Sequence, residues 1–100
     1  MDITVKELKD KIDKGEEFVL IDVREDYEFE EFNLDGKLIP LGNFPSVIPN
    51  LEEHKDKEII IHCRSGRRSA MAQQMLQQAG FANVKNLEGG VLAWIEEFGA

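Results

Sequence analysis

Short continuous apolar runs alternate along the chain with stretches in which apolar residues recur every three or four positions. A continuous run bounded by polar residues is typical of a parallel strand buried on both faces, whereas the longer spacing is typical of a helix with one buried face. The continuous runs predict strands at residues 18–22, 37–40, 58–62 and 84–87. The periodic stretches predict helices after Thr4, from about Glu25, from Val47 to Glu53, from Ser69 to Ala79 and from Val91 to Phe98.

The first helix carries signals at both of its ends. Thr4 and Glu7 have the Thr-x-x-Glu spacing of a capping box, in which each side chain binds the backbone N–H of the other residue. Leu8 lies on the apolar face of this helix, and Gly15 is expected to end it.

The helix that follows the only cysteine is expected to begin at Ser69. A serine at this point favours an N-cap, and Gly80 is placed to terminate the helix. The apolar residues predicted to form its buried stripe are Ala70, Met71, Met75, Leu76 and Ala79.

The alternation of strands and helices predicts one α/β domain over residues 1–100, with a doubly wound, mainly parallel sheet and helices on both faces. Four or five strands are expected. Right-handed crossovers bring the C-terminal ends of parallel strands to one edge, where ligands collect in such sheets. Asp22 and Cys63 each follow or close an apolar strand, so we expect them at that edge.

The charge is unevenly distributed along the chain. Of the 100 residues 42% are hydrophobic and 32% are charged, which suits a globular protein. The formal net charge of -8 argues against nucleic acid and membrane surfaces as partners, because phosphate contacts need a basic face. Arg64, Arg67 and Arg68 nevertheless lie close together. An acidic body with one basic pocket favours a small anionic ligand.

The apolar runs are much shorter than a membrane span, and Met1 leads into an acidic residue and a polar helical pattern. We therefore expect neither a transmembrane helix nor a signal peptide. The lone cysteine, Cys63, cannot form an intrachain disulfide, and a reactive thiol needs a reducing compartment. These features predict a cytoplasmic protein, and we expect a monomer.

The segment around Cys63 favours chemistry as well as packing. An apolar strand runs into Cys63, a loop with Gly66 and three arginines follows, and a helix comes next. The helix N-terminus and converging loop N–H groups attract an anion, and nearby arginines lower the pKa of a thiol. A reactive thiolate is therefore predicted. The alternative is an inert, buried thiol, which is the commoner state of a single cysteine.

The length of this loop narrows the chemistry further. Cys63 and Arg68 frame a six-residue loop, C-R-S-G-R-R, whereas the C-x-x-x-x-x-R loops of cysteine phosphatases are one residue longer and hold a phosphate. One residue less removes up to about 3.5 Å of chain. The smaller loop suits one extra sulfur atom, as a persulfide on Cys63, and disfavours a phosphatase or an arsenate reductase.

This segment resembles the active-site loop of the rhodanese family of sulfurtransferases, C-x-x-G-x-R followed by Ser or Thr. The match is carried by Cys63, Gly66, Arg68 and Ser69. F-V-L-I-D-V-R-E resembles the family's Asp-Val-Arg segment, and N-L-E-G-G-V-L-A-W resembles its Gly-Gly signature before the last helix. The resemblance implies a five-stranded doubly wound sheet and a carrier of sulfane sulfur.

The chain departs from the family pattern between Phe32 and Pro40. Many members have Gly-His-Ile-Pro-Gly-Ala there. The variant found here resembles rhodanese domains that are fused to enzymes activating ubiquitin-like sulfur carriers. That likeness suggests a sulfur relay in which a sulfur-carrier protein is a partner, beside a small anionic donor such as thiosulfate.

The resemblance implies a role for each residue of the loop. Cys63 is the expected nucleophile, and the N–H groups of residues 64–68 would stabilise its anion. Arg68 would either meet the substrate or brace the loop against a carboxylate such as Asp22. Arg64 and Arg67 are expected to contact an anionic donor, although both could be ordinary surface charges.

Other polar side chains are expected to support this site. Ser65 and Ser69 can donate hydroxyl hydrogen bonds, and Asp22 and Arg24 are expected to fix the neighbouring loop by an ion pair. His62 is expected to pack away from the thiol, because adjacent strand residues point to opposite faces.

No His, Cys or carboxylate pair has metal-ligand spacing, so neither a metal nor a cofactor is expected. Trp94 lies on an apolar helical stripe and is expected to anchor the core. The sequence thus predicts a thiosulfate sulfurtransferase. The remaining alternative is a non-catalytic module that senses sulfide or binds another protein.

Overall fold

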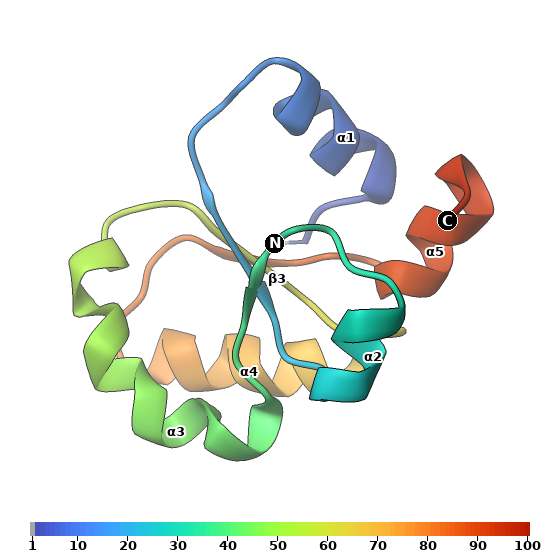
Figure 1. Ribbon diagram of the computed structural model, residues 1–100. Helices are drawn as coiled ribbons and strands as arrows, with labels where there is room; N and C mark the ends of the chain where they lie inside the picture. The colour runs from blue at the N-terminus through green and yellow to red at the C-terminus, as the bar shows by residue number, and fades with distance from the viewer. Residues whose placement is uncertain (1) are drawn as a thin grey trace.

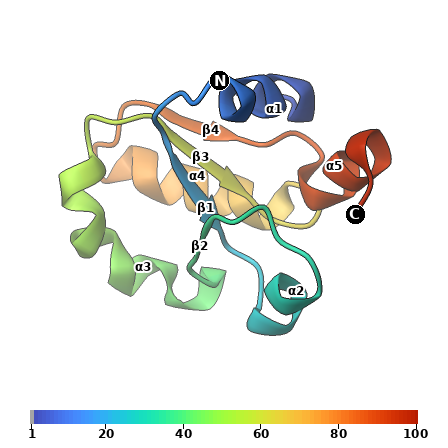
Figure 2. The same ribbon diagram turned by 45° about the horizontal axis from the view of Figure 1, so that its top comes forward.

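The computed structural model describes residues 2–100, and Met1, on which the expectation about a signal peptide partly rests, lies outside the described residues. Four parallel strands form one sheet in the order β2-β1-β3-β4 (Figure 2). They are β1 (Val19–Asp22), β2 (Lys37–Leu38), β3 (Ile59–His62) and β4 (Val84–Asn86).

A fifth position of the sheet is occupied by a single residue. Ile3 forms an isolated parallel bridge with Leu87, just beyond β4. The Ile3 N–H donates to the Asn86 carbonyl at 3.0 Å, and the Glu88 N–H donates to the Ile3 carbonyl at 2.8 Å. The predicted doubly wound parallel sheet is confirmed, with four regular strands and this short addition at the edge.

Helices cover both faces of the sheet (Figure 1). On one face lie α1 (Val5–Asp13) and α5 (Gly90–Phe98), and on the other lie α3 (Phe44–Val47) and α4 (Arg67–Gln78). The remaining helical segments are α2 (Asp26–Glu31), η1 (Leu41–Asn43) and η2 (Ile48–His54), of which the last two are 3₁₀ helices. No helix within residues 2–100 is long and apolar enough to cross a membrane.

The alternation of side chains along β3 divides the core in two. Ile59 and Ile61 pack with the helices on the α3 and α4 side, whereas Ile60 packs toward α1 and α5. All three are fully buried. This burial explains why β3 reads as a continuous apolar run, since both of its faces meet helices.

The capping box predicted at the start of α1 is confirmed. The Glu7 N–H donates to Thr4 Oγ1 at 3.1 Å, and the Thr4 N–H donates to Glu7 Oε1 at 2.9 Å. The helix ends at Asp13, and Gly15 follows with φ of +68°.

The predicted start of the helix after Cys63 is wrong. Gly66 is the N-cap, with φ of +107°, and α4 begins at Arg67, so that Ser69 lies in its first turn and is buried. The predicted apolar stripe is confirmed in its C-terminal half, where Leu76 is buried and Met75 and Ala79 pack against the core. The buried residues of α4 are Ser69, Ala72 and Leu76, whereas Ala70 and Met71 are exposed.

Candidate active site

Cys63 follows β3 directly and lies at the edge of the sheet where the strands end. Asp22, the last residue of β1, pairs in register with His62, so Asp22 and Cys63 lie near each other at this edge. Figure 2 shows the C-terminal ends of β1 and β3 on the side of the molecule where α2 and α5 lie. The sequence therefore placed these two distant residues correctly.

Hydrogen-bond donors of the loop and of α4 lie within reach of the Cys63 sulfur. The Gly66 N–H donates to Sγ at 3.1 Å, and the Ser69 hydroxyl oxygen lies 3.4 Å from Sγ. Burial raises the pKa of the thiol, but the hydrogen bonds that the hydroxyl and N–H of Ser69 and the N–H groups of Gly66 and Ser65 can donate to the ionised sulfur outweigh this effect. The pKa of Cys63 is consequently lower than that of an ordinary cysteine.

The sulfur is almost closed off from solvent, because Cys63 is only 1% exposed. Burial of this degree is what an inert thiol would show. However, an inert thiol in an apolar core would not be met by N–H groups, and at this site they point at it. Any molecule that reacts with the sulfur must first displace the groups that cover it.

The first residues of α5 orient two peptide groups of the loop. The Val91 N–H donates to the Cys63 carbonyl, and the Leu92 N–H donates to the Arg64 carbonyl, both at 3.0 Å. Because the C=O and N–H of a trans peptide point in opposite directions, a carbonyl bound to α5 directs the following N–H away from α5. The loop carbonyls are thus satisfied on one side while N–H groups remain available on the other.

Gly90 makes this contact possible. Its φ is +56°, and a Cβ at this position would lie 2.5 Å from the Cys63 carbonyl oxygen and 2.6 Å from that of Arg64. Only glycine allows α5 to approach the loop so closely. The Gly-Gly pair noted in the sequence therefore positions the active-site loop.

Arg68 braces the loop rather than reaching toward its centre. Its Nη1 and Nη2 donate to Glu28 Oε1 and Oε2 at 2.7 and 2.9 Å, a bidentate pair that joins α4 to α2. The hydrogen bonds from Arg68 lower the pKa of Glu28 to about 2. The sequence left two alternatives for Arg68, contact with the substrate or an ion pair that holds the loop. The structure shows the ion pair, and its carboxylate comes from Glu28 instead of Asp22.

Asp22 instead forms the expected buried ion pair with Arg24. Arg24 Nη2 lies 2.8 Å from Asp22 Oδ2 and also donates to the Phe32 carbonyl at 2.7 Å, so the pair fixes the segment after α2. His62 Nε2 lies 3.8 Å from Asp22 Oδ2, and burial lowers the pKa of His62. The imidazole is therefore neutral near pH 7 and packs against this pair, with no part in activating Cys63.

Two residues of the site were missed by sequence reasoning. Glu28 comes from α2, and Asn86, at the end of β4, accepts a hydrogen bond from the Ser69 hydroxyl at 2.6 Å. The Asn86 Nδ2 also donates to the Gly66 carbonyl at 3.0 Å. The only available signal was that Asn86 ends a strand at the same edge as Cys63.

The exposed residues of the loop are Arg64, Ser65 and Arg67. Beside the loop is a cavity of about 220 Å³, whose lining includes Arg64 and, from α2, Glu28. It provides room near the loop for a small molecule. Within residues 2–100, no group of three His, Cys, Asp or Glu side chains could hold a metal ion.

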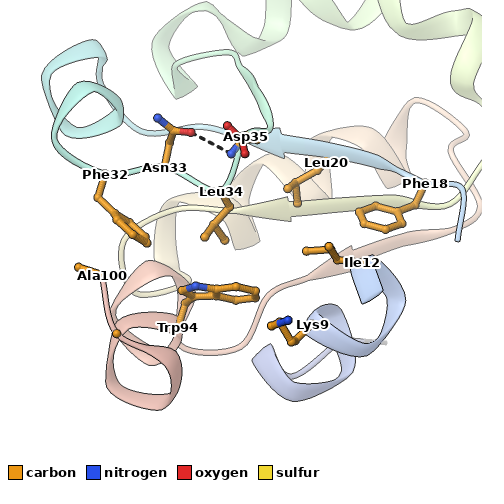
Figure 3. A pocket seen from close by; sticks show the side chains of 11 residues that line it. Lys9, Ile12, Phe18, Leu20, Phe32, Asn33, Leu34, Asp35, Trp94 and Ala100 are labelled. Carbon is orange, nitrogen blue, oxygen red and sulfur yellow. Dashed lines mark hydrogen bonds between the residues drawn. The ribbon is translucent and has the colours of Figure 1, made fainter. Parts of the chain in front are cut away.

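A larger cavity of about 590 Å³ lies away from this site, on the α1 and α5 face of the sheet (Figure 3). Apolar side chains from several elements line it, among them Phe18, Leu20, Leu34 and Trp94. Trp94 was expected to anchor the core, and it does pack against the smaller core cluster. Another part of its ring, however, borders this cavity.

Comparison with known proteins identifies relatives along almost the whole chain. Residues 4–97 match the rhodanese-like domain family. The putative sulfurtransferase YtwF of Bacillus subtilis is 43% identical over 93% of this chain and 88% of its own length. The crystal structure of a rhodanese-like domain protein from Staphylococcus aureus has a TM-score of 0.78 and 36% identity, covering 94% of this chain and 91% of that one.

A further relative is much longer than this chain. The probable adenylyltransferase/sulfurtransferase MoeZ of Mycobacterium tuberculosis is 35% identical over 95% of this chain, which spans only 24% of MoeZ. The parallel sheet, the cysteine at its edge and the extent of these matches lead to one assignment: the chain belongs to the rhodanese-like domain family.

Proposed function

We propose that this protein is a sulfurtransferase that carries a sulfane sulfur as a persulfide on Cys63. The observation that carries the proposal is the N–H group of Gly66, 3.1 Å from a sulfur whose pKa is lowered. A site of this kind stabilises a thiolate before loading and an anionic persulfide after it. Its relatives with sulfurtransferase names support the same assignment.

In the first half-reaction the Cys63 thiolate attacks the outer sulfur of thiosulfate. A new S–S bond forms on Cys63, the S–S bond of thiosulfate breaks, and its electron pair leaves with sulfite. The charge of the thiolate passes to the outer sulfur of the persulfide, where the loop N–H groups can receive it. In the second half-reaction a thiophilic acceptor, such as cyanide or a thiol, attacks that outer sulfur and regenerates the thiolate.

Arg64 and Arg67 are the residues that we assign to donor binding. Both are exposed on a loop beside the nucleophile, in a chain whose net charge is -8. They offer local positive charge to thiosulfate, while Arg68 is occupied by Glu28. The nearby cavity of about 220 Å³, which Arg64 lines, provides room for such a donor.

We further propose that a protein takes part in the physiological reaction, either as a persulfide donor or as a sulfur-carrier acceptor. MoeZ, whose name combines adenylyl transfer with sulfur transfer, supports this proposal, as does the divergent segment from Phe32 to Phe44. The reducing conditions that keep a persulfide carrier active favour a cytoplasmic location.

Steady-state turnover distinguishes this function from phosphate chemistry. The purified protein is assayed with thiosulfate plus cyanide, in which thiocyanate is measured, and separately with p-nitrophenyl phosphate. We expect thiocyanate from the wild type and none from Cys63→Ser, with no release of p-nitrophenol. Hydrolysis of the phosphate ester alone would instead identify a phosphatase.

The 1% exposure of Cys63 favours one second candidate, a non-catalytic module that binds another protein through the same surface. That candidate predicts a folded wild-type protein with no thiocyanate production from thiosulfate or from an organic persulfide. Turnover with either donor rejects it.

A further inference from the structure

Asn86 contacts the active-site loop at two points although it belongs to β4. Its Nδ2 donates to the carbonyl of Gly66, the N-cap of α4, at 3.0 Å. Its Oδ1 accepts from the hydroxyl of Ser69, in the first turn of the same helix, at 2.6 Å. Asn86 is 7% exposed and Ser69 is fully buried, so water does not compete with these bonds.

The Ser69 hydroxyl has one hydrogen but two acceptors within reach. Its oxygen lies 2.6 Å from Asn86 Oδ1 and 3.4 Å from Cys63 Sγ. The shorter contact is close to the optimum for an O–H···O hydrogen bond, which assigns the hydrogen to Asn86. The Ser69 oxygen then presents a lone pair to the sulfur, and this arrangement suits a protonated thiol better than a thiolate.

We propose that Asn86 is a positioning residue that competes with the Cys63 thiolate for the single hydroxyl hydrogen of Ser69. While the sulfur is protonated, its S–H donates to Ser69, and Ser69 donates to Asn86. After the proton leaves, the hydroxyl either turns to the sulfur and leaves the buried Oδ1 of Asn86 without a partner, or it stays on Asn86. In the second case a lone pair faces the thiolate. Either arrangement destabilises the free thiolate.

A persulfide on Cys63 removes this competition for the Ser69 hydrogen. This step of the inference rests on the proposed function. The inner sulfur of the persulfide is bonded on both sides and is uncharged. The negative charge lies on the outer sulfur, about 2.05 Å further out along the S–S bond. The Ser69 hydroxyl can therefore keep its bond to Asn86 in the loaded state. Asn86 thus favours the loaded protein over the empty thiolate.

Other charged and titratable groups lie on the elements that pack around the loop and Asn86, and each stays unchanged in the variants below. They come from the loop and α4, from α2, from the ends of β1 and β3, and from the N-terminal segment, where the Asp2 carboxylate accepts from the Asn86 backbone N–H at 3.2 Å. These groups are Arg64, Arg67, Arg68, Glu28, Asp22, Arg24, His62 and Asp2.

The test compares Asn86→Ala with Asn86→Asp. Both substitutions remove the Nδ2 donor to the Gly66 carbonyl, but only aspartate keeps an acceptor for Ser69 and adds negative charge to it. The pKa of Cys63 is measured from the pH dependence of its alkylation by iodoacetamide. We expect alanine to lower this pKa by about one unit, because Ser69 is released to the thiolate, and aspartate to raise it by about one unit. Shifts in the same direction would overturn the proposal.

A double variant tests whether the effect passes through Ser69. In a Ser69→Ala background, Asn86→Ala is expected to leave the Cys63 pKa within about 0.3 units of that of Ser69→Ala alone. A full shift in that background would contradict the proposed competition. If Asn86→Ala fails to fold, Asn86→Leu replaces it, since leucine has similar size and no acceptor. Alkylation needs no sulfur donor, so this result stands apart from the turnover assay.

Discussion

The three arginines near Cys63 differ in their contacts although they lie within five positions of the sequence. Arg68 is held by two hydrogen bonds to Glu28, whereas the side chains of Arg64 and Arg67 are exposed. A charge already neutralised by a bidentate carboxylate attracts an incoming anion less than a free one does. We therefore expect the exposed pair to bind the donor and Arg68 to hold the loop.

Arg64→Ala and Arg67→Ala should each raise the KM for thiosulfate by about three- to tenfold and leave kcat nearly unchanged. This is the pattern expected when an interaction binds substrate and transition state equally. Steady-state kinetics at constant ionic strength measures the effect. Lys57→Ala, at an exposed lysine outside the loop, makes the same change in net charge and is the matched control. An unchanged KM in both arginine variants would remove these residues from donor binding.

The contact between α5 and the loop shows how one element orients the backbone of another. Its first turn binds the carbonyls of Cys63 and Arg64, and Gly90 permits the contact. The N–H groups that follow these two carbonyls consequently point away from α5, and Val91, Leu92 and Ile95 of α5 line the cavity beside the loop. The orientation of these loop peptides is thus set by packing between elements as well as by the loop sequence.

Gly90→Ala should disrupt this arrangement. The new Cβ would meet two loop carbonyls, and alanine disfavours the positive φ, so we expect a loss of about 2 to 4 kcal/mol in unfolding free energy. We also expect at least a roughly tenfold drop in sulfur-transfer rate, since the loop donors are displaced. Chemical denaturation and turnover measure the two effects. Gly42→Ala is the control, because nothing lies within 4 Å of the added Cβ. Equal behaviour of the two variants would contradict the role given to α5.

The sequence predicted the elements better than it predicted how they meet. β1 and β3 were placed within one residue because both are continuous apolar runs. The start of α4 was misplaced because Gly66, with its positive φ, caps the helix before Ser69 can. Glu28 and Asn86 could not be assigned to the site, since their contacts with Arg68 and Ser69 arise only when separate elements pack together.

For the molecule as a whole, His62 and Glu28 are two of the groups that make stability depend on pH. His62 is fully buried, and burial lowers its pKa below the ordinary value of 6.5. Below about pH 6.5 the unfolded chain therefore binds a proton at this residue more readily than the folded protein does. Glu28 has a pKa of about 2 beside Arg68, below its ordinary value of 4.5. Its contribution is present above about pH 4.5 and is lost as the pH falls toward 2.

We therefore expect the unfolding free energy to decrease in two stages as the solution is acidified. The first stage begins below about pH 6.5 and should be absent in His62→Leu. The second lies between about pH 4.5 and 2, and Glu28→Gln should reduce it, at a cost of about 1 to 2 kcal/mol at pH 7. The part that remains in this variant is expected from Glu58 and Glu7, whose pKa values are also lowered. Urea denaturation from pH 2 to 8 checks both. If His62→Leu retained the whole of the first stage, the neutral state assigned to His62 would be incorrect.

The central claim is that inward-facing amides hold an anionic sulfur chain on Cys63. Intact-protein mass spectrometry after treatment with thiosulfate, followed by removal of the reagent, tests this claim most directly. The account predicts a gain of one sulfur, about 32 Da, in the wild type, loss of the gain on addition of cyanide, and no gain in Cys63→Ser. No added mass in the wild type, or the same added mass in Cys63→Ser, would contradict it.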